Sequence, residues 1–80
     1  MRIHGPAVRA LRELHGWSLS DLQTEVSAIR GGDRPVALSY LSELEHGHKP
    51  GSPRMAMLLA QALRCPIAAI VVGDDDREAA

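Results

Sequence analysis

The chain has 80 residues, of which 45% are apolar, but it contains no Phe, one Trp and one Tyr. This length predicts one small domain with a marginal core, which association with a second copy would help to stabilise. With Leu, Ala, Val and Ile as core residues, short packed helices are favoured over a β-sandwich. No apolar run reaches the ~18 residues of a membrane span and the first residues are too polar for a signal peptide, so we expect a cytoplasmic protein.

The net charge of −1 is unevenly distributed along the chain. Four acidic residues and one Arg lie in the segment 74–80, and we expect this acidic tail to be disordered. Residues 1–73 form the predicted domain and carry eight basic and six acidic side chains, a net charge of +2. This balance permits contact with phosphates without requiring it. The single Cys65 excludes an internal disulfide and is expected to be a buried thiol.

The first predicted helix begins at Gly5-Pro6, since proline is tolerated at the first helical position. It is expected to end near His15-Gly16. Its apolar face, at helical spacing, consists of Ala7, Val8, Leu11 and Leu14. Trp17 follows directly and is expected to fill the gap between this helix and the next.

A second helix is predicted from Ser18, because Asp21 three residues later completes the capping-box pattern. Leu22, Val26 and Ile29 continue one apolar face. The segment 30–35, Arg-Gly-Gly-Asp-Arg-Pro, then breaks the helical pattern and predicts a surface loop.

The stretch after this loop predicts a short amphipathic helix over residues 37–46, ended by Gly47. Its apolar face consists of Ala37, Tyr40, Leu41 and Leu44. Its polar face consists of Ser39, Ser42, Glu43 and His46. A helix with small polar side chains, followed by a basic exit loop, is suited to lie in a DNA groove. This is the central functional hypothesis from the residues themselves.

A fourth helix is predicted from Pro53, with Ser52 as its cap. Its buried stripe consists of Met55, Leu58, Leu59, Ala62 and Leu63. A last short apolar helix is expected over 67–72, after Pro66 and before Gly73. No segment alternates with period two, so the predicted fold class is all-α with five short helices.

Together these patterns resemble the lambda-repressor/Cro-like helix-turn-helix domains, also called the XRE type. The most specific piece is the string 36–47, which agrees with the family's recognition-helix signature at Tyr40, Leu41, Ser42, Leu44, Glu45 and Gly47. Weaker pieces are the segments 8–12 and 16–18, the core positions Leu22 and Val26, and the segment 52–63. The likeness covers residues 7–72 and implies a compact five-helix DNA-binding domain.

The resemblance implies that the second helix crosses the DNA backbone and that the third enters the major groove. Base edges would be read by Leu38, Ser39, Ser42 and Glu43. Phosphate or positioning contacts would come from Arg9, Ser18, His46, His48 and Lys49. Arg12 and Glu45 occupy positions that tend to pair in the family, and such a pair would fix the angle of the reading helix.

The connection between the second and third helices departs from the family pattern. Nine residues, 27–35, separate Val26 from Val36, where the family usually has a single glycine. Either the second helix runs on to about Ile29 before an extended loop, or the loop is a functional addition. Arg30 and Arg34 in this loop either reach a phosphate or a minor groove, or are simply solvated.

The third helix departs from the family in two further respects. Ala37 stands where a capping Ser or Thr is preferred, a loss of ~0.5–2 kcal/mol of helix stability. The reading face also lacks the Arg, Gln or Asn side chains that make bidentate base contacts. Specificity is therefore expected from a dimer, from the loop or from DNA deformability.

Two function classes follow from these residues. The favoured one is a sequence-specific, repressor-like DNA-binding regulator of phage or bacterial type. It would act as a homodimer through an apolar C-terminal surface, Ile67, Ile70, Val71 and Val72. The alternative is a protein-interaction module that docks on a subunit of the transcription machinery or another protein. No catalytic residues, metal site or cofactor are expected, because the sequence lacks a nucleophile–base pair and metal-ligand spacing.

Overall fold

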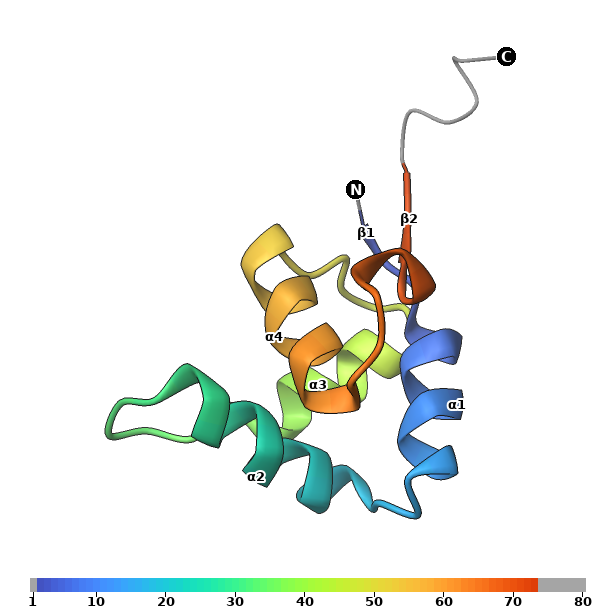
Figure 1. Cartoon of the computed structure of the whole chain (residues 1–80). Helices are drawn as coiled ribbons and strands as arrows, with labels where there is room; N and C mark the ends of the chain where they lie inside the picture. The colour runs from blue at the N-terminus through green and yellow to red at the C-terminus, as the bar shows by residue number, and fades with distance from the viewer. Residues whose placement is uncertain (1, 74–80) are drawn as a thin grey trace.

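The structure, a computed structural model, describes residues 2–73. The predicted acidic tail, residues 74–80, lies outside the described residues. Residues 2–73 form four α-helices and one small two-stranded ribbon, arranged as in Figure 1. In chain order the elements are β1 (Arg2–Ile3), α1 (Gly5–Leu14), α2 (Leu19–Arg30), α3 (Leu38–Glu45), α4 (Pro53–Leu63), a 3₁₀ turn η1 (Ile67–Ala69) and β2 (Val71–Val72). Within residues 2–73 no helix has the length and apolarity to cross a membrane.

The first four predicted helices are confirmed, together with the local signals that define them. Ser18 Oγ accepts from the Asp21 N–H and Asp21 Oδ2 accepts from the Ser18 N–H, which completes the predicted capping box of α2. Ser52 Oγ accepts from the Met55 N–H and caps α4, with Pro53 in the first turn. The fold is therefore mainly helical, as the sequence indicates.

The predicted fifth helix over 67–72 is wrong. This segment makes a single 3₁₀ turn and then enters β2, which pairs antiparallel with β1 so that Val72 faces Arg2 and Val71 faces Ile3. The Ile70 carbonyl also accepts from the His4 N–H at 2.7 Å. Consecutive β-branched side chains favour extended backbone when a partner strand is present, and here the amino terminus of the chain supplies that strand.

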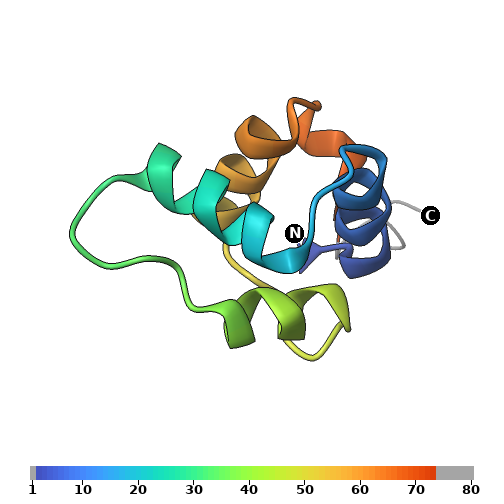
Figure 2. The ribbon, with the colours of Figure 1, turned by 90° about the horizontal axis from the view of Figure 1, so that it is seen from below.

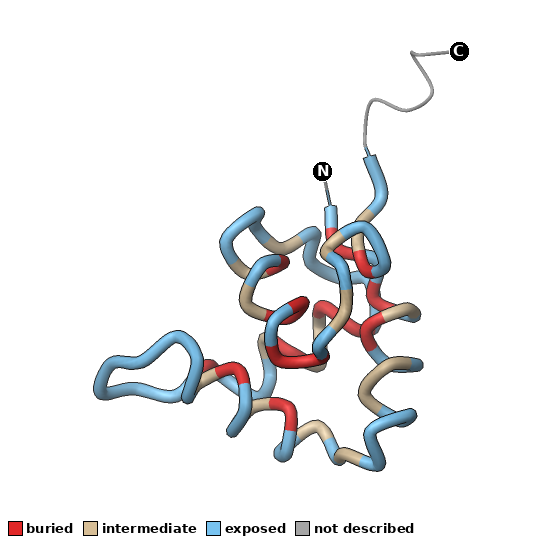
Figure 3. Tube along the Cα trace, viewed as in Figure 1, coloured by how far each residue is buried: buried red, intermediate tan, exposed pale blue. Residues whose placement is uncertain are grey.

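The core lies between the four helices, and Figure 3 shows the buried positions on their inner sides. Fully buried leucines come from α2, α3 and α4, and α1 adds Val8. Burying each of these side chains contributes about 1.5–3 kcal/mol. Trp17 packs against the same core and stacks on His15 with ring centroids 4.4 Å apart. Cys65 is half-buried, and this burial raises the pKa of its thiol.

Three predicted burial positions are corrected by the structure. Leu14 is 82% exposed. It follows the buried Gly5 by nine residues, which at about 100° per residue places it on the opposite side of α1. Ala37 and Ile29 are also exposed, since each lies at an end of its helix beside the α2–α3 loop. The periodicity identified the right helices but extended their apolar faces too far.

The predicted dimer surface is also corrected, because Ile70 is 0% exposed and belongs to the core of its own domain. Ile67 and Val71 are half-buried and pack against the same core, and Val72 remains 40% exposed. Pairing of β2 with β1 turns Ile70 inward, a contact that no local pattern in the segment specifies.

Gly5 fixes the approach of α1 to α3. It is buried, and a Cβ added there would meet the backbone of Leu44 and Glu45 at the end of α3. Only a residue without a side chain allows the two helices to come this close.

We expect Gly5→Ala to lower the free energy of unfolding by about 1–3 kcal/mol through overpacking, as measured by urea denaturation. Helix propensity alone works in the opposite direction, since Ala is favoured over Gly by about 1 kcal/mol inside a helix. A variant more stable than the wild type would therefore contradict the close approach of α1 and α3.

Candidate nucleic-acid interface

Helix α3 begins without a side-chain cap and ends in a well-defined motif. Ala37 makes no capping hydrogen bond, in line with the departure noted in the sequence. At the other end Gly47 adopts φ +79°, and its N–H donates to the Leu44 carbonyl at 3.2 Å. The His48 N–H donates to the Glu43 carbonyl at 2.9 Å. This Schellman arrangement directs the chain away from α3 into the exit loop, residues 46–52.

The outward side of α3 is open to solvent. Leu41 and Leu44 hold the helix to the core, whereas Leu38 is 42% exposed and Ser39 is exposed. Ser42 and Glu43 are half-buried at the margin of the same side. Figure 2 shows α3 along one edge of the domain, with the exit loop passing its carboxyl-terminal end. The four predicted base-reading residues therefore lie together on one accessible helix side.

The Arg12–Glu45 pair joins α1 to α3 at the base of this surface. Arg12 Nε donates to Glu45 Oε2 at 2.7 Å, and Arg12 Nη2 donates to Glu45 Oε1 at 3.0 Å. Arg12 Nη1 donates to the Trp17 carbonyl at 2.9 Å. The side chains of Arg12 and Glu45 are only 12% and 5% exposed. The pair is therefore a bidentate, largely buried ion pair, and the hydrogen bond to Glu45 raises the pKa of Arg12 above its ordinary value.

The exit loop brings three predicted phosphate contacts to the carboxyl end of α3. His46, His48 and Lys49 are all exposed. His46 Nδ1 lies 2.8 Å from the Ser42 carbonyl, and the His46 and His48 rings stack with centroids 5.9 Å apart. Lys49 Nζ lies 3.8 Å from Glu43 Oε1, a half-exposed ion pair that contributes at most about 1 kcal/mol. Glu43 therefore partly neutralises Lys49 in the free protein.

Two other predicted phosphate contacts, Arg9 and Ser18, already have acidic partners. Arg9 Nε donates to Glu13 Oε2 at 3.1 Å on the exposed side of α1. Ser18 Oγ accepts from Asp21 in the capping box, and the Asp21 carboxylate lies at the same helix end. A phosphate at the start of α2 would meet this carboxylate as well as the free N–H groups. These two positions are weaker candidates than the exit loop.

Comparison with known proteins agrees with this arrangement. A profile of the helix-turn-helix family matches residues 8–70, which include all four helices except the first turn of α1. The chain belongs to the XRE-type, lambda repressor/Cro-like helix-turn-helix family. Domains of this family are DNA-binding regulatory domains and are typically not enzymes. No curated protein and no solved structure matches the chain.

Within this helix-turn-helix domain the connection between α2 and α3 is long but anchored. Val36 is buried, its N–H donates to Ser27 Oγ at 2.9 Å, and its carbonyl accepts from Gln23 Nε2 at 2.7 Å. Both backbone polar groups of Val36 are thus satisfied by α2, just before α3 begins. The spacing of Gln23 and Ser27, four residues apart, places them on one side of α2. This spacing of two polar side chains on α2 is a sequence signal for the anchoring of Val36, which was not predicted from the sequence.

The described part of the chain contains no group of three or more His, Cys, Asp or Glu side chains that could hold a metal ion. The candidate interface of this helix-turn-helix domain combines hydroxyl, imidazole and ammonium groups with the Glu43 carboxylate and the apolar Leu38. Such groups suit hydrogen bonding to base edges and contact with phosphates.

We expect Glu45→Ala to lower the free energy of unfolding by about 3–5 kcal/mol, because it leaves the Arg12 charge buried without its partner. Thermal and urea denaturation would measure the loss. Glu13→Ala is the matched control, since it breaks the exposed Arg9–Glu13 pair and should change stability by no more than about 0.5 kcal/mol. Equal effects of the two substitutions would contradict the structural role of the buried pair.

Proposed function

We propose that this chain is a sequence-specific, repressor-like regulator that reads the major groove of DNA with α3. The observation that carries the proposal is the accessible side of α3, where Leu38 and Ser39 are exposed, opposite the leucines that hold the helix to the core. Ser39 and Ser42 donate to or accept from base edges, and Leu38 packs against a thymine methyl group. Glu43 accepts from the cytosine amino group. Leu38 and Ser39 are already exposed in the free protein.

Phosphate contacts on this proposal come mainly from the exit loop. His46, His48 and Lys49 follow α3 directly and lie exposed beside its carboxyl end. Binding to DNA moves Lys49 from Glu43 to a phosphate, which frees the Glu43 carboxylate for a base. Arg9 and Ser18 contribute less, because each is engaged with an acidic neighbour in the free protein.

The active form on this proposal is a homodimer. The reading side of α3 contains no Arg, Gln or Asn, so one domain obtains few of the bidentate contacts that discriminate between bases. Two copies double the reading surface and place their α3 helices about one DNA turn (~34 Å) apart. The exposed Val72 at the free edge of the β1–β2 ribbon, with Ile67 and Val71 beside it, is the proposed contact between copies.

We expect two substitutions to affect DNA binding in different ways. Ser42→Ala should reduce the preference for the selected site over a random duplex, because it removes a base contact. Lys49→Ala should weaken binding to both duplexes by a similar factor and reduce the slope of log affinity against log salt by about 0.9. Fluorescence anisotropy at several salt concentrations, on a site found by selection from random duplexes, measures both effects.

Arg64→Gln serves as the control for charge, since it removes one exposed cation at the end of α4 and leaves the exit loop and the β1–β2 ribbon intact. Identical behaviour of Ser42→Ala and Lys49→Ala would overturn the assignment of the reading side. Absence of salt-dependent binding to any duplex would overturn the DNA-binding function and favour a protein partner instead.

We expect light scattering during size-exclusion chromatography to give the mass of a dimer, and Val72→Asp to give a monomer that binds its site less tightly. Leu14→Asp is the control, because it places the same charge on an exposed leucine. Leu14 lies at the carboxyl end of α1, and the β1–β2 ribbon lies beside the amino end of that helix. A monomeric wild type at high concentration would refute the dimer. Dissociation by Leu14→Asp alone would move the interface away from the ribbon.

A further inference from the structure

The α2–α3 loop, residues 31–37, is internally braced. The Gly31 N–H donates to the Ser27 carbonyl at 2.9 Å, and Arg30 Nη2 donates to the Arg34 carbonyl across the loop. Gly31 and Gly32 adopt φ +76° and +93°, a conformation that L side chains rarely take, and they reverse the chain after α2. At its far end the loop returns to α2 through Val36. The loop is therefore held at both ends and across its middle.

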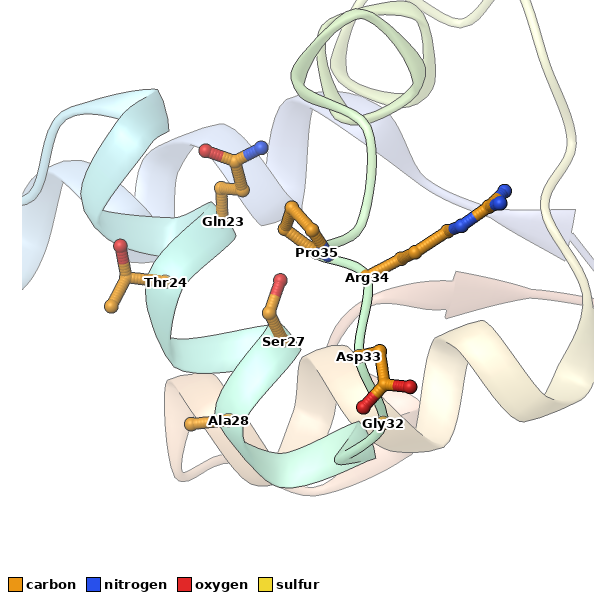
Figure 4. A pocket seen from close by; sticks show the side chains of 8 residues that line it. All are labelled: Gln23, Thr24, Ser27, Ala28, Gly32, Asp33, Arg34 and Pro35. Atoms are coloured by element: carbon orange, nitrogen blue, oxygen red, sulfur yellow. The ribbon is translucent and has the colours of Figure 1, made fainter.

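The two arginines of this segment have different surroundings. Arg30 is directed onto the loop backbone, where it holds the Arg34 carbonyl. The guanidinium of Arg34 has no hydrogen-bond or ion-pair partner among residues 2–73. Figure 4 shows its side chain extending away from α2, whereas Asp33 points in another direction. One cation thus braces the loop and the other is presented to solvent.

The presented cation lies close to the start of the reading helix. Arg34 precedes the anchored Val36 by two residues and the first residue of α3, Leu38, by four. Figure 2 shows the loop projecting from the body of the domain and returning at the amino-terminal end of α3. A hollow of about 360 Å³, lined by Thr24, Ser27 and Asp33 among others, separates the projecting loop from α2 (Figure 4). The projection therefore extends the proposed interface beyond α3 itself.

We propose that Arg34 contacts a backbone phosphate of duplex DNA bordering the groove that α3 reads, and that Arg30 is a positioning residue for it. This inference rests on the proposed function. The chemistry of the contact is that of a planar guanidinium with a phosphodiester, which the delocalised charge and forked donors of arginine suit. Duplex DNA carries one negative charge per ~1.7 Å of axis. A cation held at the rim of the groove therefore contacts a phosphate whatever the base sequence. The exit loop contacts the backbone at one end of α3 and Arg34 contacts it at the other.

Arg34→Ala is expected to weaken binding to the selected site and to a random duplex by a similar factor of about five to ten, and to reduce the salt slope by about 0.9. Arg34→Lys keeps the charge and should retain part of the affinity and all of the slope. Arg30→Ala should weaken binding less than Arg34→Ala. In the Arg34→Ala background, Arg30→Ala should cause no further loss of affinity, because the side chain that Arg30 positions is already absent.

The controls separate this proposal from the function on which it rests. Arg64→Gln removes the same charge at the end of α4, away from the loop and the β1–β2 ribbon, and circular dichroism melts show whether each variant is folded. Wild-type affinity of Arg34→Ala, while Lys49→Ala still weakens binding, would overturn the loop contact and leave the DNA-binding function intact. Additive effects of Arg30→Ala and Arg34→Ala on affinity would show two independent phosphate contacts and overturn the positioning role of Arg30. A changed sequence preference of Arg34→Ala would show base reading instead of a phosphate contact.

Discussion

The ion pair between Arg12 and Glu45 is the interaction on which the arrangement of the domain depends. It connects α1, α3 and the backbone just before α2 through three hydrogen bonds of 2.7–3.0 Å. Both side chains are largely withdrawn from water, so any rotation of α3 that separated them would leave an uncompensated charge in a medium of low dielectric. The angle of α3 is therefore fixed by contacts inside the domain, while Leu38 and Ser39 on its outer side stay exposed.

A second set of contacts replaces the short turn that is usual in this family. Gln23 and Ser27 hold Val36 from α2, while Gly5 lets α1 pack directly on the end of α3. The free-energy cost of closing a loop grows only slowly with its length, so the longer loop is tolerated once its returning end is fixed. The same anchoring gives the loop a defined position next to α3. An insertion thus extends the exposed surface without loosening the helix-turn-helix unit.

The candidate interface is balanced in charge, and this balance has consequences for binding. Lys49, Arg9 and the start of α2 each lie near an acidic side chain of the same domain. Each phosphate contact at these positions must replace an existing interaction, so its net contribution is smaller than that of a free cation. This electrostatic arrangement favours modest affinity for a single half-site. On the proposed function, a dimer and the additional loop arginine would compensate for this modest affinity.

The sequence by itself determined the four helices, the capping of α2 and α4 and the end of α3 at Gly47, because periodicity and capping are signals between residues a few positions apart. Only the tertiary structure decided that 70–72 leaves the helical pattern, since the strand that pairs with it lies at the other end of the chain. The same holds for the buried Ile70. These features depend on partners distant in sequence, and no local pattern carries that information.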